Sequence, residues 1–131
     1  MSALFSKPPA ATVLVVDDEP FIRIVIAEAL DGAGHFAIEA ENADVAMDLL
    51  HADPGIDVLI TDMHLLGSFN GQQLATKAYS IIPALKVIFM TGDCVTASRI
   101  SKHPGPGDGV LVKPFRLEDL LRMVEACLKP L

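Results

Sequence analysis

Four short, largely apolar runs in this chain each end in polar residues, and this repeated pattern constrains the fold most. The runs are 13–16, 58–61, 87–90 and 110–112, and the residues that follow them are Asp17 with Asp18, Asp62, Thr91 and Lys113. If the runs are parallel strands of one sheet, these residues meet at its carboxyl edge, where open α/β sheets bind ligands. Three acids, a hydroxyl and a lysine there indicate a site for a divalent cation and a phosphoryl group.

The apolar runs differ in a way that predicts their places in the sheet. Residues 12–16, 57–61 and 86–91 are apolar at consecutive positions, which is typical of parallel strands covered on both faces. Residues 36–40 alternate instead, with Phe36 and Ile38 on one face. This segment and the short run before Lys113 are therefore expected to be edge strands.

Helices are predicted between the strands from capping residues and apolar spacing. They run from Pro20 to Gly32 or Gly34, from Asn42 to Ala52, from Gln72 to Ile82, from Cys94 to Ser101, and onward from Leu117. Five strands alternating with five helices predict an α/β fold with right-handed crossovers and a parallel sheet.

Composition narrows the class of protein. The chain has 131 residues, the size of one domain, and is 51% hydrophobic with a net charge of −7. The acidic balance argues against a nucleic-acid surface, which needs clustered cations. We expect neither a signal peptide nor a membrane span, because residues 1–9 have no apolar core segment and no apolar stretch approaches the length of a span. Cys94 and Cys127 have no metal-ligand spacing and are expected to be two thiols in a reducing cytoplasm.

Four motifs together resemble the receiver domain of two-component response regulators. They are Val-Val-Asp-Asp-Glu at 15–19, Thr-Asp-Met at 61–63, Met-Thr-Gly at 90–92 and Val-Lys-Pro-Phe at 112–115. The resemblance covers residues 11–129. It implies a flavodoxin-like (βα)5 three-layer sandwich with strand order 2-1-3-4-5. The expected organisation is a loose leader over residues 1–10 and a receiver domain over residues 11–131.

The same resemblance assigns roles to the residues of the predicted site. It makes Asp62 the phosphoacceptor and, with Asp18, a direct ligand of Mg²⁺ or Mn²⁺. Asp17 acts on the metal mainly through a bound water, and the backbone carbonyl of His64 is a further ligand. An aspartyl phosphate is an established form of covalent chemistry for a carboxylate.

Two further residues are expected to act on the phosphoryl group. The resemblance makes Thr91 the switch hydroxyl and Lys113 the cation that pairs with the phosphoryl group, with a cis bond between Lys113 and Pro114. We also hypothesise that Asp93 and the His64 side chain tune the lifetime of the phosphorylated state. The remaining histidines, at positions 35, 51 and 103, are expected to be surface residues and not ligands.

The chain departs from the family pattern at three places. Val110 stands where an aromatic residue is common, Leu66 stands where a proline is common, and a Pro/Gly-rich run occupies residues 103–109. All three departures concern the readout of phosphorylation, so the chemistry is expected to survive while the output route differs.

The expected function is that of a stand-alone receiver, a signalling domain and not a turnover enzyme. It would take a phosphoryl group from a sensor histidine kinase or a histidine phosphotransfer protein and act on an unidentified protein target. The apolar residues around Phe21 and Ile22 in the first helix are predicted to dock that partner. Neither nucleic acid nor membrane is an expected partner, and homodimerisation stays open.

One alternative function is compatible with the same residues, and three others fit them poorly. A receiver that belongs to a larger hybrid kinase or regulator remains open. A haloacid-dehalogenase-like phosphatase needs an acid at position 64, where this chain has His64. A flavodoxin-like FMN carrier needs a phosphate-cradling loop where Asp17, Asp18 and Glu19 would repel one, and the Gly-rich P-loop of a nucleotidase is missing. Each site residue also has an interpretation without a functional role. Asp17 and Asp18 would be turn residues, Asp62 a loop acid, Thr91 a strand-end hydroxyl and Lys113 a solvated lysine.

Overall fold

The computed structural model describes residues 10–65, 67–93 and 109–129. Its centre is a parallel sheet of five strands in the order β2-β1-β3-β4-β5, as expected from the sequence. The strands are β1 (Thr12–Val16), β2 (Phe36–Ala40), β3 (Val58–Asp62), β4 (Lys86–Thr91) and β5 (Gly109–Val112). The two predicted edge strands, β2 and β5, lie at the two edges.

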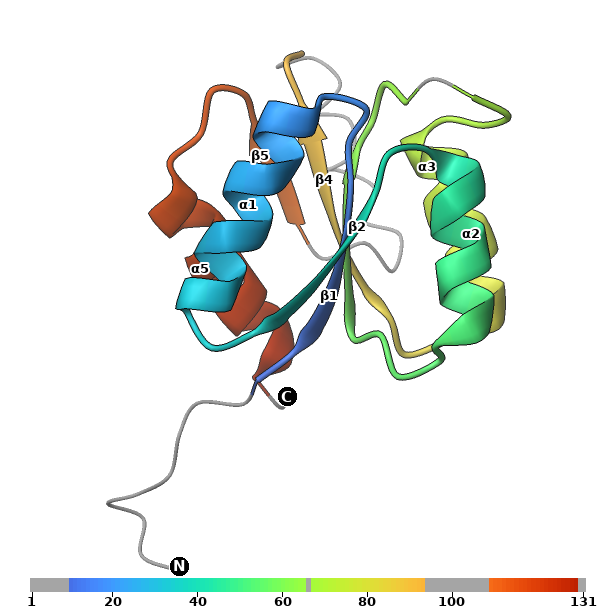
Figure 1. Ribbon diagram of the computed structural model, residues 1–131, viewed down its shortest axis with the longest axis horizontal. Coiled ribbons are helices and arrows are strands. Elements are labelled where there is room, and N and C mark those ends of the chain that lie inside the picture. The colour runs from blue at the N-terminus through green and yellow to red at the C-terminus, as the bar shows by residue number, and fades with distance from the viewer. Residues whose placement is uncertain (1–9, 66, 94–108, 130–131) are drawn as a thin grey trace, which may run out of the picture.

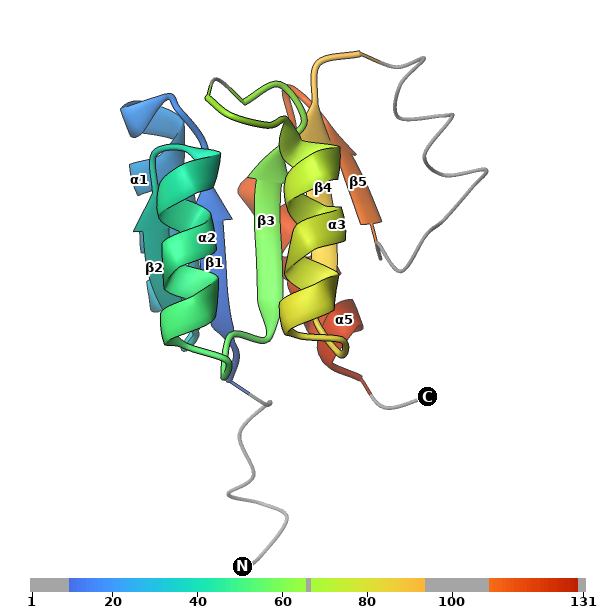
Figure 2. The same cartoon turned by 90° about the vertical axis from the view of Figure 1, so that its right-hand side faces the viewer.

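Helices cover both faces of the sheet and make three layers (Figures 1 and 2). On one face lie α1 (Pro20–Gly32) and α5 (Leu117–Leu128), and on the other lie α2 (Ala43–Ala52) and α3 (Gly71–Ile81). The fourth helix expected over residues 94–101 falls outside the described residues, as does Cys94. None of the described helices has the length and apolar character needed to cross a membrane.

Side-chain alternation divides the core into two parts, one on each face of the sheet. Leu14, Val16 and Leu59 pack under α2 and α3, whereas Val13 and Val15 pack under α1 and α5. Successive strand residues point to opposite faces, so a strand that is covered on both sides must be apolar throughout. The consecutive apolar residues of β1 and β3 therefore predicted correctly that these strands are central.

Local sequence signals set the helix ends. Pro20 begins α1, where its missing N–H costs nothing. The Asn42 side chain accepts a hydrogen bond from the Val45 N–H at 2.8 Å and caps α2. Asn70 and Gln73 form a reciprocal capping box at the start of α3, with both hydrogen bonds at 2.9 Å.

The expectation that His35 is a surface residue is wrong. His35 is buried, and its Nδ1 accepts a hydrogen bond from the Ala11 backbone N–H at 3.0 Å. The imidazole satisfies a donor at the start of β1 that the sheet leaves unpaired, which explains a polar residue in this position. His51 is exposed as expected, and the third of these histidines, at position 103, lies outside the described residues.

Candidate functional site

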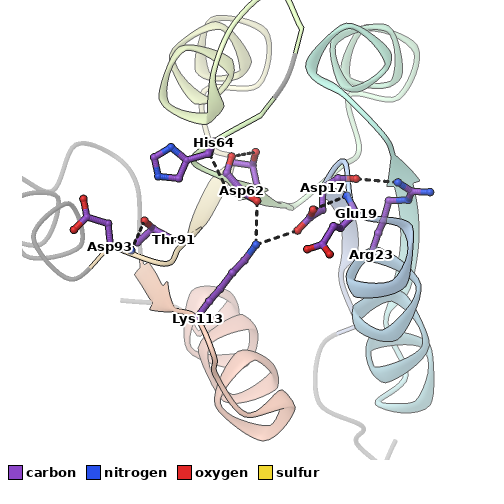
Figure 3. Close-up of polar contacts among 9 residues, drawn as sticks. Asp17, Glu19, Arg23, Asp62, His64, Thr91, Asp93 and Lys113 are labelled. Atoms are coloured by element: carbon purple, nitrogen blue, oxygen red, sulfur yellow. Dashed lines mark hydrogen bonds and ion pairs between the residues drawn. The ribbon is translucent and has the colours of Figure 1, made fainter.

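Strand register brings the sequence-predicted residues to one edge of the sheet. Val16 pairs with Thr61, Asp62 with Met90, and Thr91 with Val112, so four neighbouring strands end nearly in line. Asp17 follows β1 and Lys113 follows β5, and both side chains approach Asp62 (Figure 3). The sheet thus gathers residues that are up to 96 positions apart in the sequence.

Three carboxylates form the acidic part of the site. Asp17, Asp18 and Asp62 each have a carboxylate oxygen within 4.8 Å of the other two. Asp17 and Asp62 are buried, and Asp18 is half-buried. An all-oxygen donor set of this charge and spacing suits a hard divalent cation such as Mg²⁺ or Mn²⁺. The cluster could therefore hold a metal ion.

Lys113 joins two of these acids. Its Nζ lies 3.0 Å from Asp62 Oδ2 and 3.5 Å from Asp17 Oδ2. The Lys113 backbone N–H also donates to the Thr91 carbonyl at 2.7 Å, which ties the β5 end to β4. The bond between Lys113 and Pro114 is cis, as expected.

The pKa values of Asp17 and Lys113 are both raised, which disfavours the charged form of the acid and favours the charged form of the lysine. Burial raises the pKa of the Asp17 carboxyl, although the Glu19 N–H and the Lys113 cation partly offset this effect. Burial alone would lower the pKa of the Lys113 ammonium, but its hydrogen bond with Asp62 and the charge of Asp17 raise it above the ordinary value. Lys113 therefore remains a cation beside the acids.

Both oxygens of the Asp62 carboxylate accept hydrogen bonds. Oδ1 accepts from the His64 backbone N–H at 2.9 Å, and Oδ2 accepts from Lys113. These contacts fix the direction of the carboxylate. The His64 backbone N–H thus lies beside the acid, and its exposed imidazole points toward the side on which Thr91 and Asp93 lie (Figure 3). The role of the His64 carbonyl as a metal ligand stays a prediction.

Thr91 is fully buried at the end of β4. Its Oγ1 accepts a hydrogen bond from the Asp93 backbone N–H at 3.1 Å. A hydroxyl that accepts one hydrogen bond can still donate its own proton. Thr91 is therefore at the predicted edge with a donor to offer, while its pairing with a phosphoryl group stays a prediction.

Three residues that sequence reasoning missed support this edge. Gly71, the first residue of α3, packs so closely on β3 that an added Cβ would clash with the Asp62 carbonyl oxygen. Arg23 donates from Nη1 to the Asp17 carbonyl at 2.8 Å and pairs with Glu39 at 3.0 Å. The position of Gly71 at the start of a helix could have indicated its close packing on β3. No sequence pattern predicts the contacts of Arg23 with Asp17 and Glu39.

An apolar groove lies next to Lys113. It has a volume of about 400 Å³, and it opens between α1 and the segment that joins β5 to α5. The predicted docking residues Phe21 and Ile22 line it, and Phe21 is 78% exposed. The remaining lining residues are Val25, Ile26, Lys113, Pro114, Phe115 and Leu117.

Comparison with known proteins agrees with this geometry. Residues 13–125 match the family model of the response regulator receiver domain. The response regulator receiver protein CpdR of Brucella abortus is 31% identical over 116 residues, which are 88% of this chain and 95% of that protein. The sensor kinase CckA of the same organism is 28% identical over 121 residues, which are 92% of this chain and only 13% of that protein.

Solved structures give the same result. A receiver domain protein from Clostridium thermocellum has a TM-score of 0.80 and 26% identity, covering 90% of this chain and 94% of that one. A response regulator from Burkholderia pseudomallei, solved with a phosphorylated aspartic acid, a calcium ion and citrate, has a TM-score of 0.73 and 27% identity. That match covers 86% of this chain and 65% of the other. The fold, the acidic cluster and these matches agree, and the chain belongs to the response regulator receiver domain family.

Proposed function

We propose that this receiver domain accepts a phosphoryl group on Asp62, with Mg²⁺ or Mn²⁺ bound beside it. The observation that carries the proposal is the convergence of three carboxylates within 4.8 Å and the Lys113 ion pair to Asp62 at one sheet edge. The similar Burkholderia pseudomallei protein, which carries a phosphorylated aspartic acid and a calcium ion, supports it.

The metal would be held by the Asp18 and Asp62 carboxylates and the His64 backbone carbonyl, with Asp17 acting through a bound water. Bound at this place, the cation would neutralise charge on the phosphoryl oxygens. An Asp62 oxygen would attack the phosphorus of a phosphohistidine. An O–P bond forms as the P–N bond breaks, and the imidazole nitrogen leaves with the electron pair.

Lys113 and Thr91 would act on the product. The Lys113 ammonium, already 3.0 Å from Asp62 Oδ2, is placed to pair with an oxygen of the new phosphoryl group. The Thr91 hydroxyl would donate to another. Movement of Thr91 toward the phosphoryl group would shift the domain toward a minor active conformation. Val110 is half-buried where relatives often carry an aromatic side chain, so the readout would run through packing changes other than an aromatic swing.

The phosphoryl donor would be a sensor histidine kinase or a histidine phosphotransfer protein in the cytoplasm. Its docking place would be the apolar groove that Phe21 and Ile22 line. A helix laid in this groove by its apolar face would bring a histidine next to Lys113 and Asp62. The output would be altered binding of a downstream protein, and the same domain within a longer kinase would serve a relay, as the similarity to CckA suggests.

Incubation with acetyl phosphate and Mg²⁺, followed by intact-mass measurement, tests the proposal. One phosphoryl group is expected on the unmodified chain and none when EDTA removes the metal. Asp62→Asn keeps the size of the side chain but removes the nucleophilic charge, and it should gain none. No gain on the unmodified chain, or an equal gain on Asp62→Asn, would refute the proposal.

A further inference from the structure

The loop between β1 and α1, residues 17–19, carries two of the three clustered acids. Two backbone contacts hold it: the Asp17 N–H donates to the Ala40 carbonyl at 3.2 Å, and the Glu19 N–H donates to Asp17 Oδ1 at 2.9 Å. Glu19 caps α1 without a side-chain hydrogen bond, so the usual anchor of a helix start is missing here.

Asp18 depends on the backbone of this loop for its direction. Among the described residues, its carboxylate has no hydrogen bond or ion pair, in contrast to Asp17 and Asp62. Its position within the cluster is therefore set by the peptide plane that precedes it, and this plane contains the Asp17 carbonyl.

Arg23 holds that carbonyl. Its Nη1 donates to the Asp17 carbonyl oxygen at 2.8 Å, and the side chain reaches back from the first turn of α1 to the loop (Figure 3). Its Nε pairs with Glu39 Oε1 on β2 at 3.0 Å. The Arg23 side chain is only 15% exposed. A planar guanidinium with two engaged nitrogens has little freedom to rotate, so the loop is fixed to α1 and β2 at once.

We propose that Arg23, oriented by Glu39, is a positioning residue that presets the Asp17 and Asp18 carboxylates for cation binding. This inference rests on the proposed metal site. The positive charge of Arg23 and its positioning of the loop predict opposite effects of its removal on Mg²⁺ affinity. As a nearby cation it repels Mg²⁺, so its removal would tighten binding if charge alone mattered. As a positioning residue it lowers the cost of ordering the site, so its removal weakens binding.

Titration calorimetry of the full chain with Mg²⁺, without a phosphodonor, tests the sign. Arg23→Met keeps the long apolar stem and removes both donors, and it is expected to bind Mg²⁺ about tenfold more weakly, as for other groups that orient metal ligands. The matched control is Arg116→Met, because Arg116 is 79% exposed and pairs with Glu118 at 3.5 Å. Its Mg²⁺ affinity should stay within about twofold of the unmodified chain.

A kinetic measurement separates positioning from loss of structure. With acetyl phosphate, the Mg²⁺ concentration for half-maximal phosphorylation should rise about tenfold in Arg23→Met, while the maximal rate at saturating Mg²⁺ stays unchanged. If Arg23→Met does not fold, Arg23→Gln is measured by the same criterion. Equal or tighter Mg²⁺ binding by a folded variant overturns this inference alone. Absence of Mg²⁺ binding by the unmodified chain overturns the proposed metal site, and this inference with it.

Discussion

At the scale of single residues, the site is a balance between crowded acids and one lysine. Asp17 is fully buried, and burial raises its pKa in spite of the nearby Lys113 ammonium. A carboxyl whose pKa is raised by folding binds its proton more tightly in the folded state. Ionised Asp17 at neutral pH therefore costs stability, which fits a residue kept for metal binding and not for packing.

Replacing Asp17 with asparagine should consequently stabilise the protein. Asp17→Asn keeps an acceptor for the Glu19 N–H, gives up the 3.5 Å contact with Lys113 and removes the buried charge, and in metal-free buffer at pH 7 its Tm should rise by about 3–6 °C. The same variant should bind Mg²⁺ more weakly. Thermal unfolding followed by circular dichroism measures the first effect. Asp48→Asn, on an exposed part of α2, should leave the Tm unchanged, and a lower Tm for Asp17→Asn would contradict the account.

Gly71 should be intolerant of any side chain. An added Cβ would meet the Asp62 carbonyl oxygen, a backbone atom that cannot move aside without shifting Asp62 itself. Gly71→Ala should lower the free energy of unfolding by about 1–3 kcal/mol, measured by urea denaturation. The control is Gly32→Ala at the end of α1, where an added Cβ meets no atom within 4 Å. That variant should be neutral or up to about 1 kcal/mol more stable, and equal losses in both variants would refute the packing explanation.

At the scale of elements, α1 has apolar residues on both its buried and its exposed side. Its inner face, with Ile26 and Leu30, packs on the sheet, while Phe21 and Ile24 are exposed. A helix in a soluble domain normally shows water a polar face. The exposed Phe21 side chain, which lines the groove, is the part of this helix that the proposed docking would cover.

Phe21→Gln should slow phosphotransfer from the histidine-bearing partner by about tenfold, because an exposed aromatic anchor in an interface is worth on the order of 1–2 kcal/mol. Phosphorylation by acetyl phosphate needs no docking and should be unchanged. Phe36→Gln is the matched control, since Phe36 is 66% exposed on β2 and does not line the groove. Equal slowing with both phosphodonors would exclude docking at Phe21.

The hydrogen bond between the Ala11 N–H and the His35 imidazole, at the opposite end of β1 from the acidic cluster, can also be tested for its contribution to stability. His35→Leu keeps a side chain of similar size but leaves the Ala11 N–H without its acceptor. This loss should lower the free energy of unfolding by about 1–3 kcal/mol. His51→Leu, on an exposed position, should change stability by less than about 0.5 kcal/mol. Urea denaturation of both variants decides the point, and a neutral His35→Leu would show that this hydrogen bond does not stabilise the fold.

At the scale of the whole molecule, the sequence predicted what depends on periodicity and strand ends. The apolar residues of β1 and β3 predicted central strands, and the residues that follow the strands predicted which side chains meet at the edge. What depends on the packing of distant elements was not predictable. Arg23 and Glu39 meet only because α1 lies along β2, and the buried His35 side chain pairs with the N–H of Ala11, 24 residues away in the sequence.

The central claim is that Asp62, among three clustered acids, is the residue that carries the phosphoryl group. Borohydride reduction of the chain after treatment with acetyl phosphate and Mg²⁺ converts an aspartyl phosphate to homoserine, and peptide mass spectrometry then locates it. Because Asp62 is the acid that both Lys113 and the His64 N–H orient, the account predicts homoserine at position 62 only. Homoserine at position 17 or 18, or at no position in a phosphorylated chain, would contradict it.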